Sequence, residues 1–313
     1  MSLKIFSTHD LPREEWDRLT KDSFLSSYEF ARLWEIFGGC PIFLAQETHG
    51  ALTSGLTGVI FGRSFYRRFK SMPDGLTGGI VNDGKMDAEE IKSANHEFTN
   101  YLKGRGFARI DIYSPRWPIE EAGFNKRDVM TQVVDLTGEY KPSDAEVPRH
   151  IRHGLKGDGV VAERIDGEDL ESFYKLVLET ASRHGQKPRY PLVFFKRLRA
   201  MAENDKRIIW PAVYHDGRLA AAHIYFLERG ELFHWQGFSS QEHWNLKPNH
   251  LLLNFIIEFA RRSGIGSLDL GGSPPEAAGL REFKAGWGGK DVCRNYYTHL
   301  NGFGKLYFRG KRR

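Results

Sequence analysis

Apolar side chains follow the same pattern twice along the chain. Residues 91–115 have apolar positions at the three- and four-residue spacing of one helix face, then glycines that stop the helix, then the short strand IDI. Residues 249–274 repeat this order and end in the strand LDL. Aligning the two strands also aligns Gly106 with Gly264. The pattern therefore predicts two copies of one helix-strand unit.

A matching hairpin lies upstream of each unit. Residues 41–61 and 210–230 each contain two apolar strands joined by a short turn, HG in the first and DG in the second. A helical stretch with spaced aromatic side chains precedes each hairpin, FLSSYEFARLWEIF before the first and YPLVFFKRLRAMAE before the second. We predict an α/β protein with two tandem domains, each a mixed, mainly antiparallel sheet flanked by helices.

Length and a break in composition support this division. A chain of 313 residues has room for two domains of about 150 residues each. Gly, Pro, Ser and Asp cluster in GEYKPSDAEVP, at 138–148. We therefore place the first domain at residues 1–143 and the second at residues 144–313. The order of elements in each half is that of a GNAT-like (acyl-CoA N-acyltransferase) domain, so the duplication predicts two such domains in tandem.

The charge of the chain favours anionic partners. Lys and Arg outnumber Asp and Glu by 45 to 40, which gives a net charge of +5 and a pI near 9.0, at a mean hydropathy of −0.48. Basic residues cluster at 63–70, at 149–156 and in the tail at 305–313. No stretch has the roughly 18 consecutive apolar residues that a membrane span needs. The basic tail is a candidate for peripheral contact with a membrane surface.

The cysteines and the first residues bear on the compartment. Cys40 and Cys293 are too few for a disulfide framework and suit a reducing environment. The opening residues MSLKIFSTHDLPREEW lack the apolar core of a signal peptide. We expect a cytoplasmic protein, and we expect a monomer.

Several short segments, taken in order, resemble the Fem-type transferases, which are the peptidoglycan-bridge aminoacyl transferases, and their broader relatives. The segments are SSYEFARLWEIFGG, SMPDGLTGGIV, RHIRHGLKGDGV, ETASRHGQKPRYPLVFFKRL, and LDLGGS followed by GLREFKAGWGG. The last is the most specific, because it looks like the family's strand, glycine turn and Phe-Lys-x-x-aromatic-Gly signature. The resemblance covers most of the chain. It implies transfer of an acyl group to an amine. Fem-type enzymes move an amino acid from a charged tRNA onto a cell-wall precursor peptide, and their broader relatives act in polysaccharide or other envelope chemistry.

Two departures from the family leave the acyl donor open between aminoacyl-tRNA and acyl-CoA. The region between residues 168 and 204 is too short for the long helical hairpin of many tRNA-facing members. The loop SSQEHWNLKPNHLL lacks the Arg/Gln-x-x-Gly-x-Gly/Ala pattern that holds the pyrophosphate of coenzyme A. We expect no further cofactor, and an acceptor that is an anionic small molecule or a lipid-linked envelope precursor. The alternatives are a coenzyme-A-dependent N-acyltransferase and a non-catalytic relative that binds RNA or polysaccharide.

The signature segment supplies the main catalytic candidate. Lys284 matches the lysine of the family's signature, and a cation there could meet a donor phosphate or the oxyanion that develops on the carbonyl. A lysine on a helix surface is the alternative. Phe283 and Trp287 are candidates for substrate contact, and core packing is the alternative for both. As a substrate contact, Trp287 would be a platform on which a base or a sugar ring stacks.

Asp269 is the second catalytic candidate. A carboxylate among strand apolar residues needs a hydrogen-bond partner or a role as a base or an orienting group. Asp111 holds the same place in the first half, which favours a structural role for both. Gly271 and Gly272 follow the strand, and without side chains they would let a ligand approach the backbone, or they form a plain turn.

The remaining candidates are substrate-binding residues outside the signature segment. They are Arg152 in the second basic cluster, Arg183 and Tyr190 in the loop SRHGQKPRYP, and His223 and Trp235 on the second hairpin. Ordinary packing or a solvated loop is the alternative for each. The spacing HIRH lacks a carboxylate or cysteine partner, so we predict no metal site.

Overall fold

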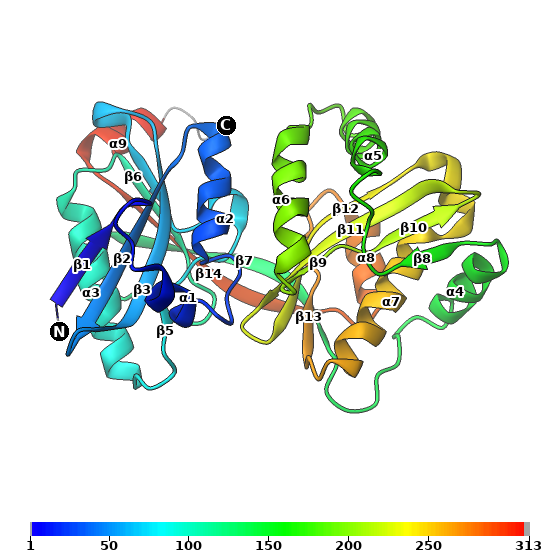
Figure 1. Ribbon diagram of the computed structural model, residues 1–313, viewed down its shortest axis with the longest axis horizontal. Helices are drawn as coiled ribbons and strands as arrows, with labels where there is room; N and C mark the ends of the chain where they lie inside the picture. Colours follow the sequence, from blue (N-terminus) through cyan, green and yellow to red (C-terminus); the bar gives the residue numbers. More distant parts are fainter. Residues whose placement is uncertain (1, 310–313) are drawn as a thin grey trace. The chain divides into compact units, whose positions relative to one another are not determined.

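The repeated pattern corresponds to regular elements in both halves of the computed structural model, which describes residues 2–309 (Figure 1). The first helix-strand unit is α3 (Ala88–Gly104) and β6 (Arg109–Tyr113), and the second is α7 (Pro248–Arg262) and β13 (Ser267–Asp269). The side chain of Asp87 caps α3 and Glu90 completes a capping box, so local sequence fixes the start of this helix.

The first half contains these further elements: β1 (Ser2–Phe6), α1 (Arg13–Leu19), α2 (Tyr28–Leu33), η1 (Trp34–Phe37), β2 (Cys40–Thr48), β3 (Ala51–Phe61), η2 (Ser64–Tyr66), β4 (Arg68–Lys70), η3 (Pro73–Gly75), β5 (Val81–Asn82) and β7 (Phe124–Asp135). The second half contains α4 (Val147–Lys156), β8 (Val160–Ala162), α5 (Leu170–Arg183), α6 (Leu192–Asn204), β9 (Ile208–Ile209), β10 (Ala212–His215), β11 (Arg218–Glu228), β12 (Glu231–Ser239), η4 (Gln241–Leu246), α8 (Ala278–Gly286), β14 (Lys290–Leu300) and α9 (Gly302–Arg309). Both predicted hairpins, β2–β3 and β10–β11, are present.

The chain divides into two compact units whose limits differ from the predicted division at residue 143. The first unit comprises residues 1–129 and 293–313, and the second comprises residues 130–292. The difference arises from two long strands: β7 starts in the first unit and ends in the second, and β14 does the reverse. The linker composition near residue 143 marks a loop, whereas the boundary falls inside β7, where no turn residues signal it.

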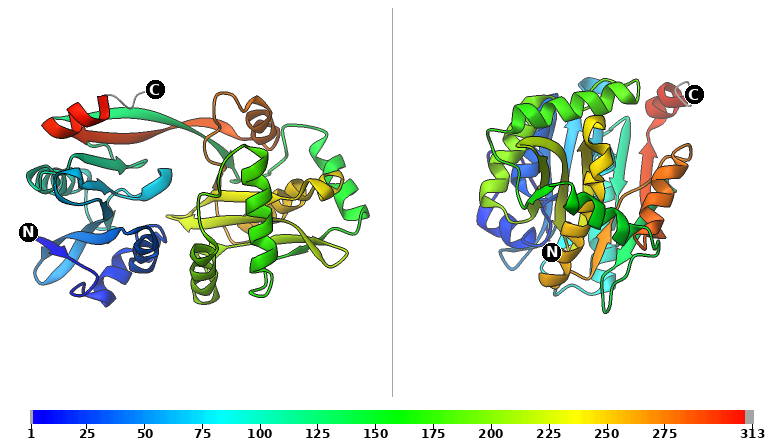
Figure 2. Two further views of the ribbon diagram at one scale, coloured as in Figure 1. Left: turned by 90° about the horizontal axis from the view of Figure 1, so that it is seen from above. Right: turned by 90° about the vertical axis from the view of Figure 1, so that its right-hand side faces the viewer.

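The sheet of the first unit has the strand order β1-β2-β3-β4-β6-β14, with β5 paired to β3. The neighbours β3 and β4 are antiparallel and β4 and β6 are parallel, so the sheet is mixed. Helix α3 packs its apolar face on it through Ile91, Phe98 and Leu102, which lie in one buried cluster with Ile110 and Ile112 of β6. Figure 2 shows α9 following β14 at the end of the described chain.

The sheet of the second unit has the order β7-β13-β12-β11-β10-β8, with β9 paired to β11. Successive residues of β11 point to opposite faces. Tyr225 packs in a buried cluster with Leu253 and Ile256 of α7 and with Trp287, after α8. Phe226 lies on the other face, where its ring contacts Trp235. One face of this sheet is therefore covered by α7 and by the segment that contains α8 and Trp287.

The basic tail has only partly a structural description. Lys311, Arg312 and Arg313 lie outside the described residues, so the predicted membrane contact of this part of the tail stays a prediction. Within residues 2–309, no helix combines the length and apolarity needed to cross a membrane.

Candidate functional site

After β13 the chain stays paired with β7 through Leu270 and Gly271, and the two glycines of the sequence motif form the bend at which it leaves the sheet. Gly271 has φ +73°, a left-handed conformation that favours glycine. A Cβ atom at Gly272 would lie 3.0 Å from the carbonyl oxygen of Met130 on β7. The carbonyl oxygen of Gly272 accepts a hydrogen bond from Lys284, and that of Gly271 accepts from Lys284 and from the backbone N–H of Gln132 on β7.

Lys284 is buried, although it lies on a helix whose other residues are largely exposed. Its side chain is 5% exposed, and Lys284 is the one buried residue of α8. The ammonium group donates to the carbonyl oxygens of Gly271 at 3.0 Å and Gly272 at 2.8 Å. An ammonium group has three donors. Among residues 2–309, these two carbonyls are its hydrogen-bond acceptors, which leaves one N–H for a ligand.

Burial lowers the pKa of Lys284 from its ordinary 10.5 to about 8, and the negative charge of Asp269 acts in the opposite direction. The group is therefore mainly a cation at neutral pH and titrates close to it. A buried cation with a donor to spare can stabilise negative charge on an incoming oxygen atom.

Asp269, at the end of β13, is held by hydrogen bonds from both sides. Its carboxylate accepts the hydroxyl proton of Thr131 at 3.1 Å and the backbone N–H of Gly271 at 2.7 Å, and the residue is 4% exposed. The second bond closes the bend that carries the two carbonyls. Asp269 thus shapes the bend and supports the charge of Lys284, which makes it a positioning residue.

Replacement of Asp269 by asparagine is expected to lower the pKa of Lys284 further below its present value of about 8, because it removes the one negative charge that opposes the effect of burial. The measurement is an NMR titration of the Lys284 Cε resonance. Asp135→Asn is the matched control, because Asp135 is an exposed carboxylate on the neighbouring strand β7. An unchanged Lys284 titration in Asp269→Asn would contradict this electrostatic coupling.

A group of buried polar rings lies on the same face of the sheet. The Nδ1 of His223 is 2.9 Å from the hydroxyl of Tyr225, and its Nε2 is 3.1 Å from Oδ1 of Asn249 at the start of α7. Burial lowers the pKa of His223 to about 4. The pKa of His234 is also lowered, first by burial and then by electrostatic interaction with His223 and Lys284. Both imidazoles are therefore neutral at pH 7.

His234 has a buried ring nitrogen that a ligand could use. In the described part of the chain, its Nε2 has no hydrogen-bond partner. Its ring lies 4.8 Å from that of His223 and 4.9 Å from that of Tyr225. A Cβ atom on Gly237 would approach this nitrogen to 3.2 Å, so the glycine keeps the space beside it open. His234 belongs with Lys284 in the candidate site.

The predicted site residues do not all come together. Tyr190 is 2% exposed and stacks on Phe194, with ring centroids 4.7 Å apart, and it also contacts Trp235 at 5.1 Å. These rings lie with Phe226 on the opposite face from His223, in the core between the sheet and α6. Tyr190 and Trp235 therefore have packing roles in the structure.

The aromatic residues beside Lys284 also pack in the interior. Trp287 is 1% exposed and belongs to the core cluster of the second unit, and Phe283 is half-buried against that cluster. The ring of Phe283 meets that of His250 edge-on, with centroids 5.1 Å apart. Together they fix the orientation of α8 and hence the direction of Lys284.

The two predicted arginines lie at different places. Arg183, at the end of α5, donates to the carbonyl of Ser239 at 3.4 Å and lies over the ring of Trp244 at 5.0 Å. The hydroxyl of Ser239 also accepts from Asn249 at 3.5 Å, so Arg183 is linked to the start of α7. Arg152 is exposed on α4. Its predicted role in binding an anionic acceptor stays a prediction.

Sequence reasoning left out Thr131 and Asn249 and did not select His234. Thr131 comes from β7, 138 residues before Asp269, so no local pattern links the two. Asn249 is the second residue of α7, and its contact with His223, 26 residues earlier, has no signal in the local sequence. In residues 2–309, no group of three or more His, Cys, Asp or Glu side chains could hold a metal ion.

Comparisons with known proteins agree with this fold. Residues 144–285 match the family model described as an acetyltransferase (GNAT) domain. Among solved structures, FemX is similar at 15% identity, with a TM-score of 0.75 and 99% of each chain covered. A domain assigned as the C-terminal domain (DUF2156) of a lysylphosphatidylglycerol synthetase from Agrobacterium fabrum is similar at 13% identity, with a TM-score of 0.59 and 95% of each chain covered.

A tandem GNAT protein from the clavulanic acid biosynthesis pathway is similar at 11% identity, with a TM-score of 0.50, covering 96% of this chain and 98% of that one. A search of curated proteins gave no match. At these identities the structural likenesses concern the fold, and they confirm the prediction of GNAT-like domains in tandem. Together with the family model, they support an acyltransferase of the GNAT fold.

Proposed function

We propose that this protein is an N-acyltransferase that moves an acyl or aminoacyl group onto an amine of a cell-envelope precursor, at the bend after β13. The observation that carries the proposal is the buried ammonium group of Lys284, which is fixed by the carbonyls of Gly271 and Gly272 and has a third N–H to donate. This group occupies the position of the lysine in the Fem-type signature that the sequence resembles.

The reaction that this geometry supports is direct transfer without a covalent enzyme intermediate. The nitrogen of a neutral amine attacks the carbonyl carbon of the donor, a C–N bond forms, and the C–O bond of an ester donor or the C–S bond of a thioester donor breaks. One amine proton passes to the departing oxygen or sulfur. Negative charge develops on the carbonyl oxygen during this step, and the N–H of Lys284 can stabilise it.

The start of α7 favours an aminoacyl ester donor over acyl-CoA. A helix start that binds pyrophosphate offers several free backbone N–H groups. Here the first helical residue is Pro248, which has no N–H, and the N–H groups of His250 and Leu251 both donate to the carbonyl of Lys247. The side chain of Asn249 is engaged by His223 and Ser239. These contacts support aminoacyl-tRNA as the donor.

The acceptor that we propose is anionic and belongs to envelope synthesis. The resemblance to Fem-type transferases implies a cell-wall precursor, and the structural neighbour from Agrobacterium fabrum is assigned to a synthetase named after a lipid, lysylphosphatidylglycerol. The basic cluster at 149–156, which includes Arg152, could bind the phosphate of either kind of acceptor.

The test is a transfer assay that offers donors and acceptors in separate combinations. Purified protein is incubated with aminoacyl-tRNA or with acyl-CoA, and with amine-bearing peptidoglycan precursors or an aminated polysaccharide fragment, and a new amide is sought by mass spectrometry. We expect product with aminoacyl-tRNA and an envelope precursor, and a much lower rate of formation after replacement of Lys284.

Thermal-shift measurements with each donor separate the alternatives. A ligand at 100 times its dissociation constant stabilises the protein by about 2.7 kcal/mol. Stabilisation and turnover with acyl-CoA alone would replace the proposed donor with coenzyme A. RNA binding that weakens with salt and is never accompanied by turnover would instead show a binding protein without catalysis.

A further inference from the structure

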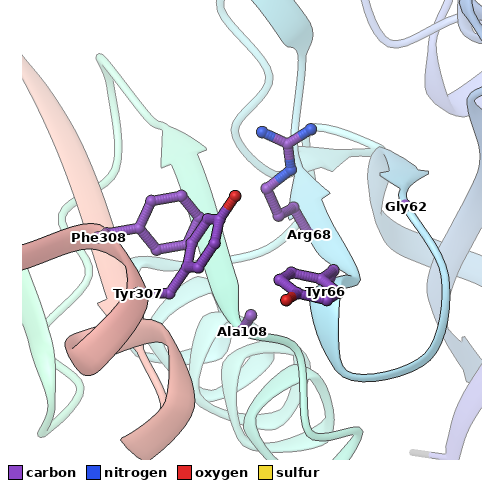
Figure 3. A pocket seen from close by; sticks show the side chains of 6 residues that line it. All are labelled: Gly62, Tyr66, Arg68, Ala108, Tyr307 and Phe308. Carbon is purple, nitrogen blue, oxygen red and sulfur yellow. The ribbon is translucent and has the colours of Figure 1, made fainter. Parts of the chain in front are cut away.

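A face of the first unit combines exposed aromatic and aliphatic side chains with cations. It is formed by the loop and turn at 62–68, the segment 105–109 and helix α9, and we call it the α9 face. A pocket of about 450 Å³ lies in it, lined by Gly62, Tyr66, Arg68, Ala108, Tyr307 and Phe308 (Figure 3). The proposed transfer reaction uses none of these residues.

The apolar side chains of this face are exposed to an unusual degree for their size. Leu306 is 76% exposed, Phe65 57%, Tyr66 45% and Tyr307 39%. Single exposed apolar residues are common, but four large ones gathered in one place mark an interaction surface. A surface of this kind needs a partner that can receive aliphatic and aromatic groups together.

Ring contacts hold the aromatic side chains in place. Phe303 lies 5.1 Å from the rings of both Phe65 and Tyr66, and the rings of Tyr66 and Tyr307 lie 5.2 Å apart. Side chains that are already ordered lose little conformational freedom when a partner covers them. The face is therefore preformed rather than dependent on a partner for its shape.

The exposed charges on the segments that form this face are of one sign. The segments 61–70, 105–109 and 301–309 contain no Asp or Glu. Arg63, Arg68, Arg105 and Lys305 are exposed on them, and Arg67 and Arg109 are partly exposed. The partner must consequently be anionic as well as able to accept apolar groups.

The pocket provides a position for one anionic group. Figure 3 shows the Tyr307 hydroxyl directed toward the side of the pocket where the Arg68 guanidinium lies, with the ring of Phe308 beside it. A guanidinium group and a hydroxyl group can bind the same phosphate group, the first as a fork of donors. The volume of about 450 Å³ is large enough for a phosphate-bearing head group.

We propose that the α9 face docks on the surface of an anionic phospholipid bilayer, with Phe65 and Leu306 inserted at the head-group level and a lipid phosphate bound at Arg68. Interfacial helices combine aromatic and aliphatic residues with Lys and Arg in this way, and anionic lipids attract each basic residue. A nucleic acid would match the charge but offers no environment for an aliphatic side chain as exposed as Leu306. The proposal does not depend on the transfer reaction.

The test is co-sedimentation of the full chain with lipid vesicles at about 0.1 M salt. We expect binding to vesicles of phosphatidylglycerol and phosphatidylcholine in equal parts, and much weaker binding to phosphatidylcholine alone. The double variant Phe65→Ser/Leu306→Ser and the single variant Arg68→Glu are each expected to reduce the affinity by about tenfold or more. Circular dichroism checks that each variant is folded.

Matched control variants carry the same chemical changes on the second unit. Val160→Ser/Leu178→Ser removes two apolar side chains that are 63% and 44% exposed, and Arg197→Glu reverses the charge of an exposed arginine on α6. These controls are expected to bind vesicles like the unmodified protein. Equal losses in the controls, or no binding to anionic vesicles, would overturn the proposal. Binding of tRNA but not of vesicles, weakened by Arg68→Glu, would also overturn it and assign the face to RNA.

Discussion

Replacement of Lys284 by methionine is expected to reduce the rate of acyl transfer by about 10²–10³-fold, the usual cost of removing one donor to a developing oxyanion. Methionine keeps most of the length of the side chain and removes the ammonium group that Gly271 and Gly272 hold. The measurement is kcat/KM with the donor and acceptor pair identified by the transfer assay. Lys290→Met is the matched control, because Lys290 is exposed and follows the same helix.

The pH dependence of transfer tests the charge state of this lysine. With a pKa of about 8, the ammonium group is lost as the pH rises through that value, so kcat/KM should fall above pH 8 in the unmodified protein. Lys284→Arg keeps a cation at every accessible pH and should lose this decline if it retains activity. A folded Lys284→Met variant with full activity would end the proposed role of Lys284.

The same pKa predicts how stability depends on pH. The lowered pKa means that the folded state holds the charged lysine at a cost, which is fully present below pH 8 and disappears as the pH rises toward 10.5. Relative to Lys284→Met, the unmodified protein should gain up to about 3 kcal/mol over this range. Comparing the two proteins cancels the effect of the buried tyrosines, which both share. A flat difference across this range would show that the lysine is not buried as a cation.

Replacement of Asp111 by alanine is expected to lower the free energy of unfolding of the first unit by about 2–3 kcal/mol, because it leaves partly buried cations without their counter-charge. Asp111 is 3% exposed and accepts from Nε of Arg109 at 2.7 Å and from the hydroxyl of Thr298 at 2.9 Å. Its charge also opposes the effect of burial on the pKa of Lys70. Urea unfolding followed by a probe in the first unit measures the change.

The hydroxyl partner of Asp111 gives the control. Thr298→Val removes one neutral donor and leaves the charges paired, so it should cost about 1 kcal/mol. Equal effects of Asp111→Ala and Thr298→Val would show that the hydrogen bond, and not the charge, is what matters. Neither substitution should change the pH profile of transfer, because both residues lie in the first unit, outside the candidate site.

The two aspartates of the repeat show how far the sequence could predict this site. Alignment of the strands placed Asp111 and Asp269 at equivalent positions and favoured a structural role for both. Asp111 has that role, through Arg109 two residues earlier on its own strand. The corresponding position before Asp269 is Ser267, which carries no positive charge, and the second carboxylate holds the glycine bend instead. Equivalent positions in the repeat therefore have different chemistry.

The predictable features of the fold were local ones. Helix periodicity, glycine stops and turn dipeptides located α3, α7 and both hairpins, and the signature motif located Lys284. The burial of Lys284 could not be read in this way, because its carbonyl partners lie 12 and 13 residues earlier, beyond the pattern of α8. Trp235 looked like a cleft residue because the alternation of a strand does not reveal which face a helix covers. Tyr190 looked like a loop residue, and its stacking on Phe194 and Trp235 in the core has no signal in the local sequence.

The two long strands impose an order on folding during synthesis. Residues 130–292 emerge as one continuous stretch, so the second unit has all its strands before the chain is finished. The first unit starts earlier but is completed last, because the edge of β6 is paired only when Tyr296–Leu300 leave the ribosome. Until then β6 is an open strand edge, which can pair with other chains. A chain truncated after residue 292 should therefore have a folded second unit and an unfinished, aggregation-prone first one.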